Sequence, residues 1–128
     1  MFLSDLVGGG ELNDHELCEL LGATKIRSNH VDITFLEKNI DANFIISNFI
    51  GLSESAKECL INKHKYVIYE HDHKYLKNRN PAQYKDYLAP KSEIVNFDFY
   101  SAARAVMCQS SFHRDIILKN LNIDNVCN

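Results

Sequence analysis

Short apolar runs alternate along this chain with segments whose apolar residues recur at helical spacing. The short runs are bounded by turn-forming residues, a pattern that predicts β-strands. They cover residues 2–5, 24–27, 43–48, 65–70 and 105–108, and a further element begins at 126–127. The central residues of 65–70 are apolar without a break, which is typical of a strand covered on both faces.

The intervening segments predict helices at residues 11–21, 33–38, 53–63, 92–103 and 110–120, with a short helix opening at Asn80-Pro81. Serines stand at the starts of the third and last of the long helices, where a side-chain oxygen can accept from the first free amides. Strand and helix therefore alternate over the whole chain. This order predicts one Rossmann-like α/β domain over 1–128, with a mainly parallel sheet of five or six strands and helices on both faces.

The helix at 11–21 has its own pattern. Leu12, Leu17, Leu20 and Leu21 fall near one side, which we expect to face the sheet, and Gly22 ends the helix. Three polar residues, Glu11, His15 and Glu19, recur every four positions. We interpret that polar side as a solvated face.

Composition excludes several classes of protein. The 128 residues include 17 acidic and 14 basic side chains, for a net charge of −3, so the basic footprint of a nucleic-acid binder is missing. No apolar run is long enough to span a bilayer, and the first residues lack the basic start of a secretory signal. The four cysteines form no C-x-x-C pair and each lies in an apolar stretch. We expect buried free thiols and a cytoplasmic protein.

Parallel sheets bind ligands at the carboxyl ends of their strands, and polar clusters follow three of the predicted strands. The first is Gly8-Gly9-Gly10-Glu11, where glycines allow close backbone approach and helix amides favour an anion. It is neither G-x-G-x-x-G nor a lysine-bearing phosphate loop. A plain tight turn explains it equally well.

The second cluster, Glu70-His71-Asp72-His73, lies at the end of strand 65–70. Two histidines one residue apart project to the same side of an extended chain. They could ligate a metal, act as an acid, base or ligand-orienting group, or be polar loop residues. We favour a substrate-site role, because a third metal ligand is not evident in the sequence.

The third cluster, Gln109-Ser110-Ser111, follows strand 105–108. Helix capping is the simplest role for either serine, and the same turn would border a ligand cleft. No G-x-S-x-G elbow is present, which argues against a serine hydrolase.

Taken in order, three segments resemble the N-terminal domain of a GT-B-type glycosyltransferase of the retaining, nucleotide-sugar-dependent group. The segments are Ser4-Asp5 with Gly8-Gly9-Gly10-Glu11-Leu12, the stretch 66–73, and 105–117, which reads AVMCQSSFHRDII. Together they extend over nearly the whole chain.

The resemblance implies roles for particular residues. Gly8, Gly9, Gly10 and Glu11 would lie near the donor diphosphate or the acceptor. His71 or His73 would line the acceptor side of the reaction centre, with Asp72, Ser110 and Ser111 in the substrate cleft. No metal or other cofactor is expected in this domain, and a nucleotide-sugar would be the donor of the complete enzyme.

Transferases of this group have two such domains, and the second binds most of the donor. The chain ends at 125–128, about where the family crosses to that second domain, so we expect the donor-binding domain to be missing and transfer by this chain alone to be inefficient. The expected partners are that C-terminal domain and a sugar or glycan acceptor, and a homo-oligomer is left open. Two alternatives remain: a small metal-dependent hydrolase using His71, Asp72 and His73, and a receiver-like interaction module with Asp5 as the phosphorylated residue.

Overall fold

The computed structural model describes residues 1–3 and 9–128. Their six strands form one parallel sheet in the order β2-β1-β3-β4-β5-β6. The strands are β1 (Phe2–Leu3), β2 (Ile26–Arg27), β3 (Asn43–Ile46), β4 (Lys65–Glu70), β5 (Ala105–Cys108) and β6 (Val126–Cys127). The expected Rossmann-like α/β domain with a parallel sheet is confirmed. The expected residues Ser4, Asp5 and Gly8 lie outside the described ranges.

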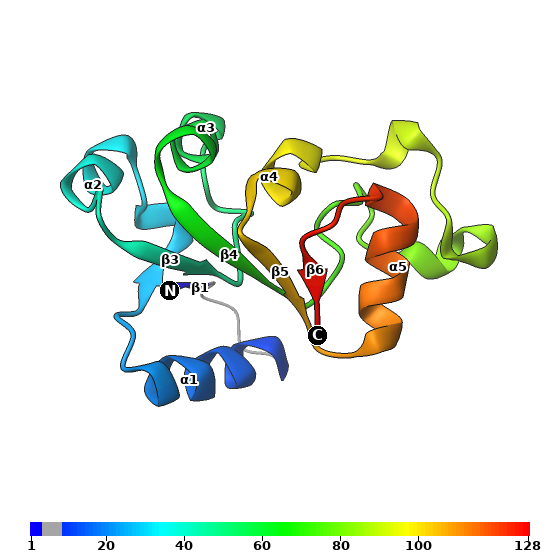
Figure 1. The fold of residues 1–128 in the computed structure, drawn as a ribbon, viewed down its shortest axis with the longest axis horizontal. Helices are drawn as coiled ribbons and strands as arrows, with labels where there is room; N and C mark the ends of the chain where they lie inside the picture. The colour runs from blue at the N-terminus through cyan, green and yellow to red at the C-terminus, as the bar shows by residue number, and fades with distance from the viewer. Residues whose placement is uncertain (4–8) are drawn as a thin grey trace.

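Helices lie on both faces of the sheet (Figure 1). The five α-helices are α1 (Gly9–Leu21), α2 (Ile33–Lys38), α3 (Glu54–Lys63), α4 (Phe97–Ala102) and α5 (Ser111–Leu121). Figure 1 shows α1 on one side of the strands, and α2, α3 and α4 on the other. Side chains of α5 join the core of the latter face through Ile117 and Leu121.

Four 3-10 turns complete the described elements. They are η1 (Ser28–His30), η2 (Pro81–Gln83), η3 (Lys85–Tyr87) and η4 (Lys91–Glu93). The expected Asn80-Pro81 start is confirmed as a 3-10 turn, with the Asn80 side chain accepting from the Ala82 amide at 3.1 Å. A serine cap was expected for α3 at Ser53 or Ser55 and for α5 at Ser110 or Ser111, and the caps are Ser53 and Ser110.

The expected long helix over 92–103 is wrong. The chain makes η4, then turns at Asn96, which has a positive φ of 56°, and only then begins α4. The Asn96 side chain donates to the carbonyl of Lys74 at 3.0 Å and accepts from the Lys57 ammonium at 3.2 Å. Asparagine tolerates the left-handed conformation, and these tertiary contacts stabilise a break that helical periodicity does not report.

The main core is on the α2–α5 face, where aromatic rings fill the space above the central strands. Tyr66 stacks on Phe99 with ring centroids 4.9 Å apart, and Phe49 packs against both Phe99 and Tyr100. The smaller core, under α1, contains Met1, Leu3 and Cys18. Cys18, Cys59 and Cys108 are buried free thiols, as expected, and Cys127 is exposed.

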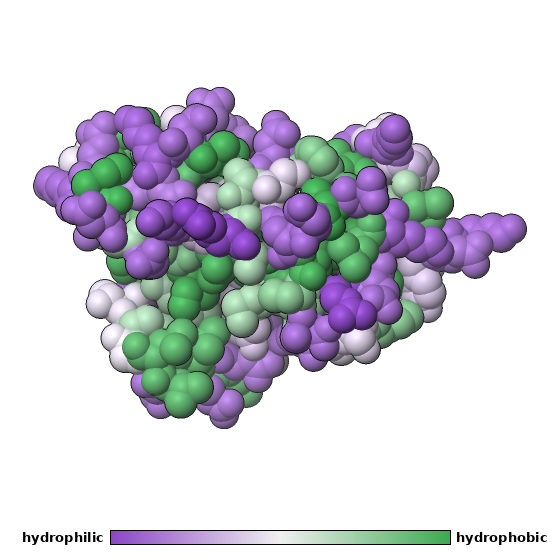
Figure 2. All heavy atoms as spheres, in the orientation of Figure 1, coloured by the Kyte–Doolittle hydropathy of each residue, from purple (hydrophilic) through white to green (hydrophobic). Residues whose placement is uncertain are grey.

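Helix α1 turns Asp14 and Cys18 toward the sheet rather than its leucines, which corrects the predicted orientation. His15 and Glu19 are exposed, as expected for a solvated face. Asp14 and Cys18 are buried, whereas Leu12, Leu20 and Leu21 are exposed. Figure 2 shows the resulting apolar surface over α1, at the lower left of the view. The reason is the pairing of Asp14 with polar groups at the strand ends, described below.

Because α1 covers only part of its face, the strands are buried unequally. The Met107 side chain of β5 is 39% exposed. Its neighbours Val106 and Cys108 point to the other face and are buried. Strand β4 alternates between fully and partly buried residues, so it is covered more completely on the α2–α5 face.

Candidate functional site

The candidate site is a pocket at the carboxyl ends of β3 and β4. The sheet order reverses between β1 and β3, and ligands of open α/β sheets bind in the crevice at such a switch point. The pocket has a volume of about 240 Å³ and a mainly polar lining. It is lined by Gly10, Glu11 and Asp14 from α1, Ser47 and Asn48 after β3, and His71, Asp72 and Lys74 after β4.

The loop after β4 is anchored on the buried carboxylate of Glu70. One of its oxygens accepts from the amide of His71 at 3.0 Å and from the amide of Asp72 at 2.9 Å. The other accepts from the hydroxyl of Tyr100. Burial alone would raise the pKa of Glu70, but the Lys74 ammonium, the Tyr100 hydroxyl and the Asp72 amide hold that pKa below its usual value. The loop therefore folds around a charged carboxylate.

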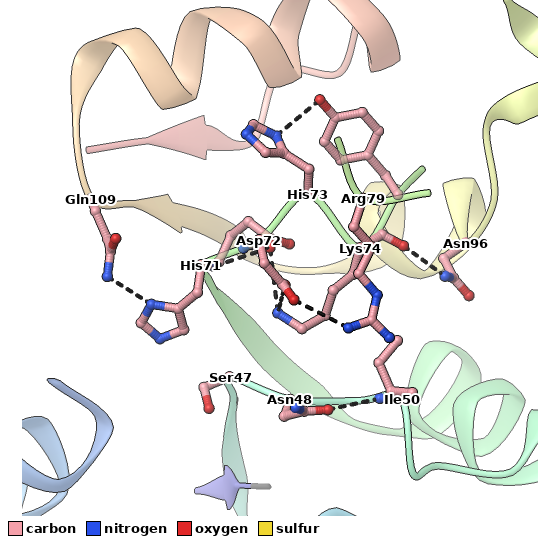
Figure 3. A network of polar contacts seen from close by, with 12 residues as sticks. Ser47, Asn48, Ile50, His71, Asp72, His73, Lys74, Arg79, Asn96 and Gln109 are labelled. Atoms are coloured by element: carbon pink, nitrogen blue, oxygen red, sulfur yellow. Dashed lines mark hydrogen bonds and ion pairs between the residues drawn. The ribbon is translucent and has the colours of Figure 1, made fainter. Parts of the chain in front are cut away.

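Lys74 supplies the buried positive charge. Its ammonium lies 3.5 Å from Glu70, forms an ion pair with Asp72, and lies 5.9 Å from the centre of the Phe49 ring. Arg79 approaches the second oxygen of Asp72 at 3.3 Å (Figure 3). Asp72 thus lies between two cations, and its position at the pocket wall is fixed by both.

His71 extends from this loop toward α1 and forms a dyad with Asp14. Its Nε2 lies 2.9 Å from Asp14 Oδ1, and both side chains are largely buried. The other Asp14 oxygen accepts from the hydroxyl of Ser47, which is also close to the carbonyl of Phe2. The chain Ser47–Asp14–His71 therefore ties the ends of β1, β3 and β4 to the first half of α1.

Gln109 lies directly after β5, and its side chain contacts the second ring nitrogen of His71. Its amide nitrogen is 2.7 Å from His71 Nδ1 (Figure 3). When the amide donates to Nδ1, the ring proton is on Nε2 and is donated to Asp14. This is the arrangement of a base, because the carboxylate orients the imidazole and leaves the other nitrogen as an acceptor.

Helix α1 packs closely on His71 at Gly10. A Cβ built at Gly10 would lie 3.3 Å from Cγ of the His71 ring, closer than ordinary van der Waals contact. On its other side the His71 ring meets Tyr69 edge-on, with centroids 4.6 Å apart. The ring is held between the helix and the strand end that precedes it.

His73 points away from His71 and from the pocket (Figure 3). Its Nδ1 is 3.1 Å from the hydroxyl of Tyr75, and its ring lies 4.2 Å from that of His113. Burial, with the nearby His113, lowers the pKa of His73 to about 4, and burial likewise lowers the pKa of His113. A positive φ of 55° at His73 produces the change of direction. The two histidines that alternation would place on one side are therefore separated.

The remaining residues predicted for the site fall into two groups, those that line the pocket with His71 and those that do not. Gly10, Glu11 and Asp72 line the pocket with His71. Gly9 begins α1, and Gly8 is outside the described residues. Ser110 accepts from the amide of His113 at 3.2 Å as the cap of α5, and Ser111 is the exposed first residue of that helix. Neither serine lines the pocket.

Within residues 1–3 and 9–128, no three or more His, Cys, Asp and Glu side chains are grouped to hold a metal ion. His71 and His73 have different neighbours, so the geometry gives the hydrolase alternative no support. No helix in the described ranges is both long and apolar enough to cross a membrane.

Sequence reasoning missed Asp14, Ser47, Glu70 and Lys74. A signal was available for Glu70, a carboxylate at the end of a strand that is otherwise mostly apolar, because such a group must find buried partners. Asp14 gave no comparable signal, since three other acidic residues occur in the same helix. Comparison with family models, curated proteins and solved structures finds no match for this chain. The function is therefore argued from the pocket itself.

Proposed function

We propose that this chain is the acceptor-side domain of a GT-B-type glycosyltransferase, with the acceptor sugar bound in the pocket at the ends of β3 and β4. The observation that carries the proposal is the Asp14–His71 dyad in a polar pocket at the switch point of the sheet. Sugar hydroxyls both donate and accept, and the lining offers carboxylate, amide, imidazole and ammonium groups to match them.

The balance of charges in this pocket favours an acceptor over a diphosphate. Three carboxylates, those of Glu11, Asp14 and Asp72, line it with Lys74 and His71. Lys74 is already paired with Glu70 and Asp72. A neutral sugar avoids the repulsion that a diphosphate would meet beside these carboxylates. The diphosphate would then be bound by the second domain of the complete transferase.

The chemistry follows from the orientation of His71. An acceptor hydroxyl that replaces the Gln109 amide at Nδ1 would donate its proton there, while Nε2–H continues to donate to Asp14. The acceptor oxygen forms a bond to the anomeric carbon of a nucleotide-sugar, and the bond from that carbon to the diphosphate breaks, with the electron pair leaving on the diphosphate. His71 takes the hydroxyl proton. The other predicted histidine, His73, would act only by holding the loop.

The test is sugar binding by this chain. A glycan microarray identifies a bound saccharide, and calorimetry measures its affinity for wild type, His71→Ala and, as a control, His30→Ala, because His30 is exposed and outside the pocket. We expect His71→Ala to weaken binding about tenfold, as for a lost hydrogen bond, and His30→Ala to change nothing.

Uridine and guanosine diphosphates serve as the second pair of probes, and we expect neither to compete with the sugar. Absence of saccharide binding, or binding that is insensitive to His71→Ala, would contradict the proposal. In a complete transferase containing this chain, His71→Ala should lower turnover by about one to three orders of magnitude. Unchanged turnover in the double variant His71→Ala, His73→Ala would remove both residues from the site.

A further inference from the structure

A second, shallower hollow of about 500 Å³ adjoins the pocket across the His71–Gln109 contact. Gln109 lines this hollow, and its hydrogen-bond partner His71 lines the first pocket. Helix α1 borders both, with Gly10 and Asp14 at the first and Leu17 and Leu20 at the second. Among the described residues, the two hollows have no lining residue in common, and the hydrogen bond from Gln109 to His71 joins a residue of one to a residue of the other.

The second hollow differs from the first in its chemistry. Its apolar part is formed by Leu17, Leu20 and Tyr69, and its polar part by Asn13, Glu16 and Gln109. A sugar ring likewise has an apolar face of C–H groups and a rim of hydroxyls. Two amides that donate and accept, beside an aromatic ring and two leucines, match both parts of such a ring. Among the described residues, those that line the first pocket are glycine and polar or charged residues, which match hydroxyls.

We propose that this hollow is a second saccharide subsite, so that the acceptor is an oligosaccharide with its terminal sugar in the first pocket and the preceding sugar on Leu20 and Tyr69. The inference rests on the proposed function and specifies its substrate class. Gln109 connects the two subsites: when the terminal sugar's hydroxyl takes its place at His71 Nδ1, the amide is free to bond the preceding sugar.

An exposed leucine beside this hollow offers an apolar contact to a ligand. Leu20 is 82% exposed, beside a hollow that contains another leucine and a tyrosine. A second copy of α1 is a poor occupant, because the helix carries Glu11, Glu16 and Glu19 outside its buried side and neither lysine nor arginine. Two such helices would place carboxylates opposite each other. A neutral saccharide meets no such repulsion.

The experiment compares an oligosaccharide found on the array with the same saccharide shortened one sugar at a time to the monosaccharide. Leu20→Ser removes one of the three apolar side chains of the hollow without disturbing the core, because Leu20 is exposed. Leu21→Ser is the matched control, because Leu21 is in the same helix, is 55% exposed and lies outside the hollow. We expect Leu20→Ser to weaken oligosaccharide binding about three- to tenfold and to leave the monosaccharide unaffected. Leu21→Ser should change neither.

Failure of the subsite is distinguishable from failure of the proposed function. If the monosaccharide binds as tightly as the oligosaccharide, or if Leu20→Ser and Leu21→Ser have the same effect, the subsite is wrong while the acceptor pocket stands. If no saccharide binds, both are wrong. Sedimentation is the remaining check: a dimer of the wild type that Leu20→Ser dissociates would assign the hollow to a second copy and overturn the subsite.

Discussion

The Nε2 atom of His71 lies 2.9 Å from a carboxylate oxygen of Asp14, although the two residues are 57 positions apart in the sequence. This contact joins the loop after β4 to the inward side of α1. It also explains why α1 buries an aspartate while exposing three of its leucines. A single pairing therefore decides both the orientation of the helix and the placement of the imidazole.

Replacing Asp14 should cost stability as well as binding. Asp14→Ala leaves the Ser47 hydroxyl and the His71 ring without their partner in a buried place, so we expect the free energy of unfolding to fall by about 2 kcal/mol. Urea denaturation measures this change. Glu16→Ala is the control, because it also replaces an acidic residue of α1 by alanine but at an exposed position, with a smaller gain in helix propensity than Asp14→Ala. Equal stability of the two variants would contradict the role of Asp14.

The Glu70–Lys74 pair should show strong coupling. Glu70→Gln leaves the buried Lys74 ammonium without its main buried counter-charge, and we expect a loss of about 3 kcal/mol. Lys74→Met should be similarly costly, because it leaves the Glu70 carboxylate buried without its cation. In the double variant both charges are gone, and part of the loss should be recovered.

Denaturation of the four proteins in this cycle gives the coupling energy directly. Additive losses would mean that the two groups do not stabilise each other. The same variants should alter the amide resonances of His71 and Asp72, since both amides donate to Glu70.

The buried histidine pair predicts a pH dependence. Burial lowers the pKa of His73 to about 4, with His113 also lowered, so the folded protein resists protonation that the unfolded chain accepts near pH 6.5. The unfolded state then binds more protons, and stability falls as pH drops from about 6.5 toward 4. Each histidine contributes at most about 1.4 kcal/mol per pH unit.

Unfolding in urea at pH 7, 6 and 5 measures this slope. His73→Asn keeps a residue that tolerates the positive φ and removes one titrating ring, so its slope should be smaller. His30→Gln, at an exposed position, should keep the wild-type slope. Glu70 lies nearby, but its pKa is below its usual value, so its own effect on the pH dependence of stability occurs at lower pH than that of the histidines. Identical slopes in all three proteins would disprove the prediction.

Gly10→Ala should weaken saccharide binding while changing the free energy of unfolding only a little. Alanine favours the helix by up to about 1 kcal/mol, whereas its Cβ presses on the His71 ring. We expect a net stability change below about 1 kcal/mol, a shifted His71 ring resonance and weaker saccharide binding. Asn13→Ala in the same helix turn should leave the His71 resonance in place. An unmoved His71 signal in Gly10→Ala would show that the contact is not tight.

Local patterns in the sequence determined the alternation of strands and helices and several helix ends. Lys65–Glu70 and Ala105–Cys108 form strands with the expected bounds, one of the two expected serines caps each of α3 and α5, and a 3-10 turn begins at Asn80-Pro81. These features depend on contacts within a few residues, so a linear pattern contains them. The expectation that polar clusters follow the strands also placed Gly10, Glu11, His71 and Asp72 at one pocket.

Tertiary structure alone decided which side of each element faces inward at the site. The spacing of the leucines in α1 predicted that their side of the helix faces the sheet. Periodicity contains no information about Ser47 and His71, which come from other elements and pair with Asp14. Strand alternation likewise predicted that His71 and His73 project to the same side. The positive φ of His73 instead directs its side chain toward His113. Buried polar groups must be paired, and their partners come from distant strands, so only the assembled sheet specifies these orientations.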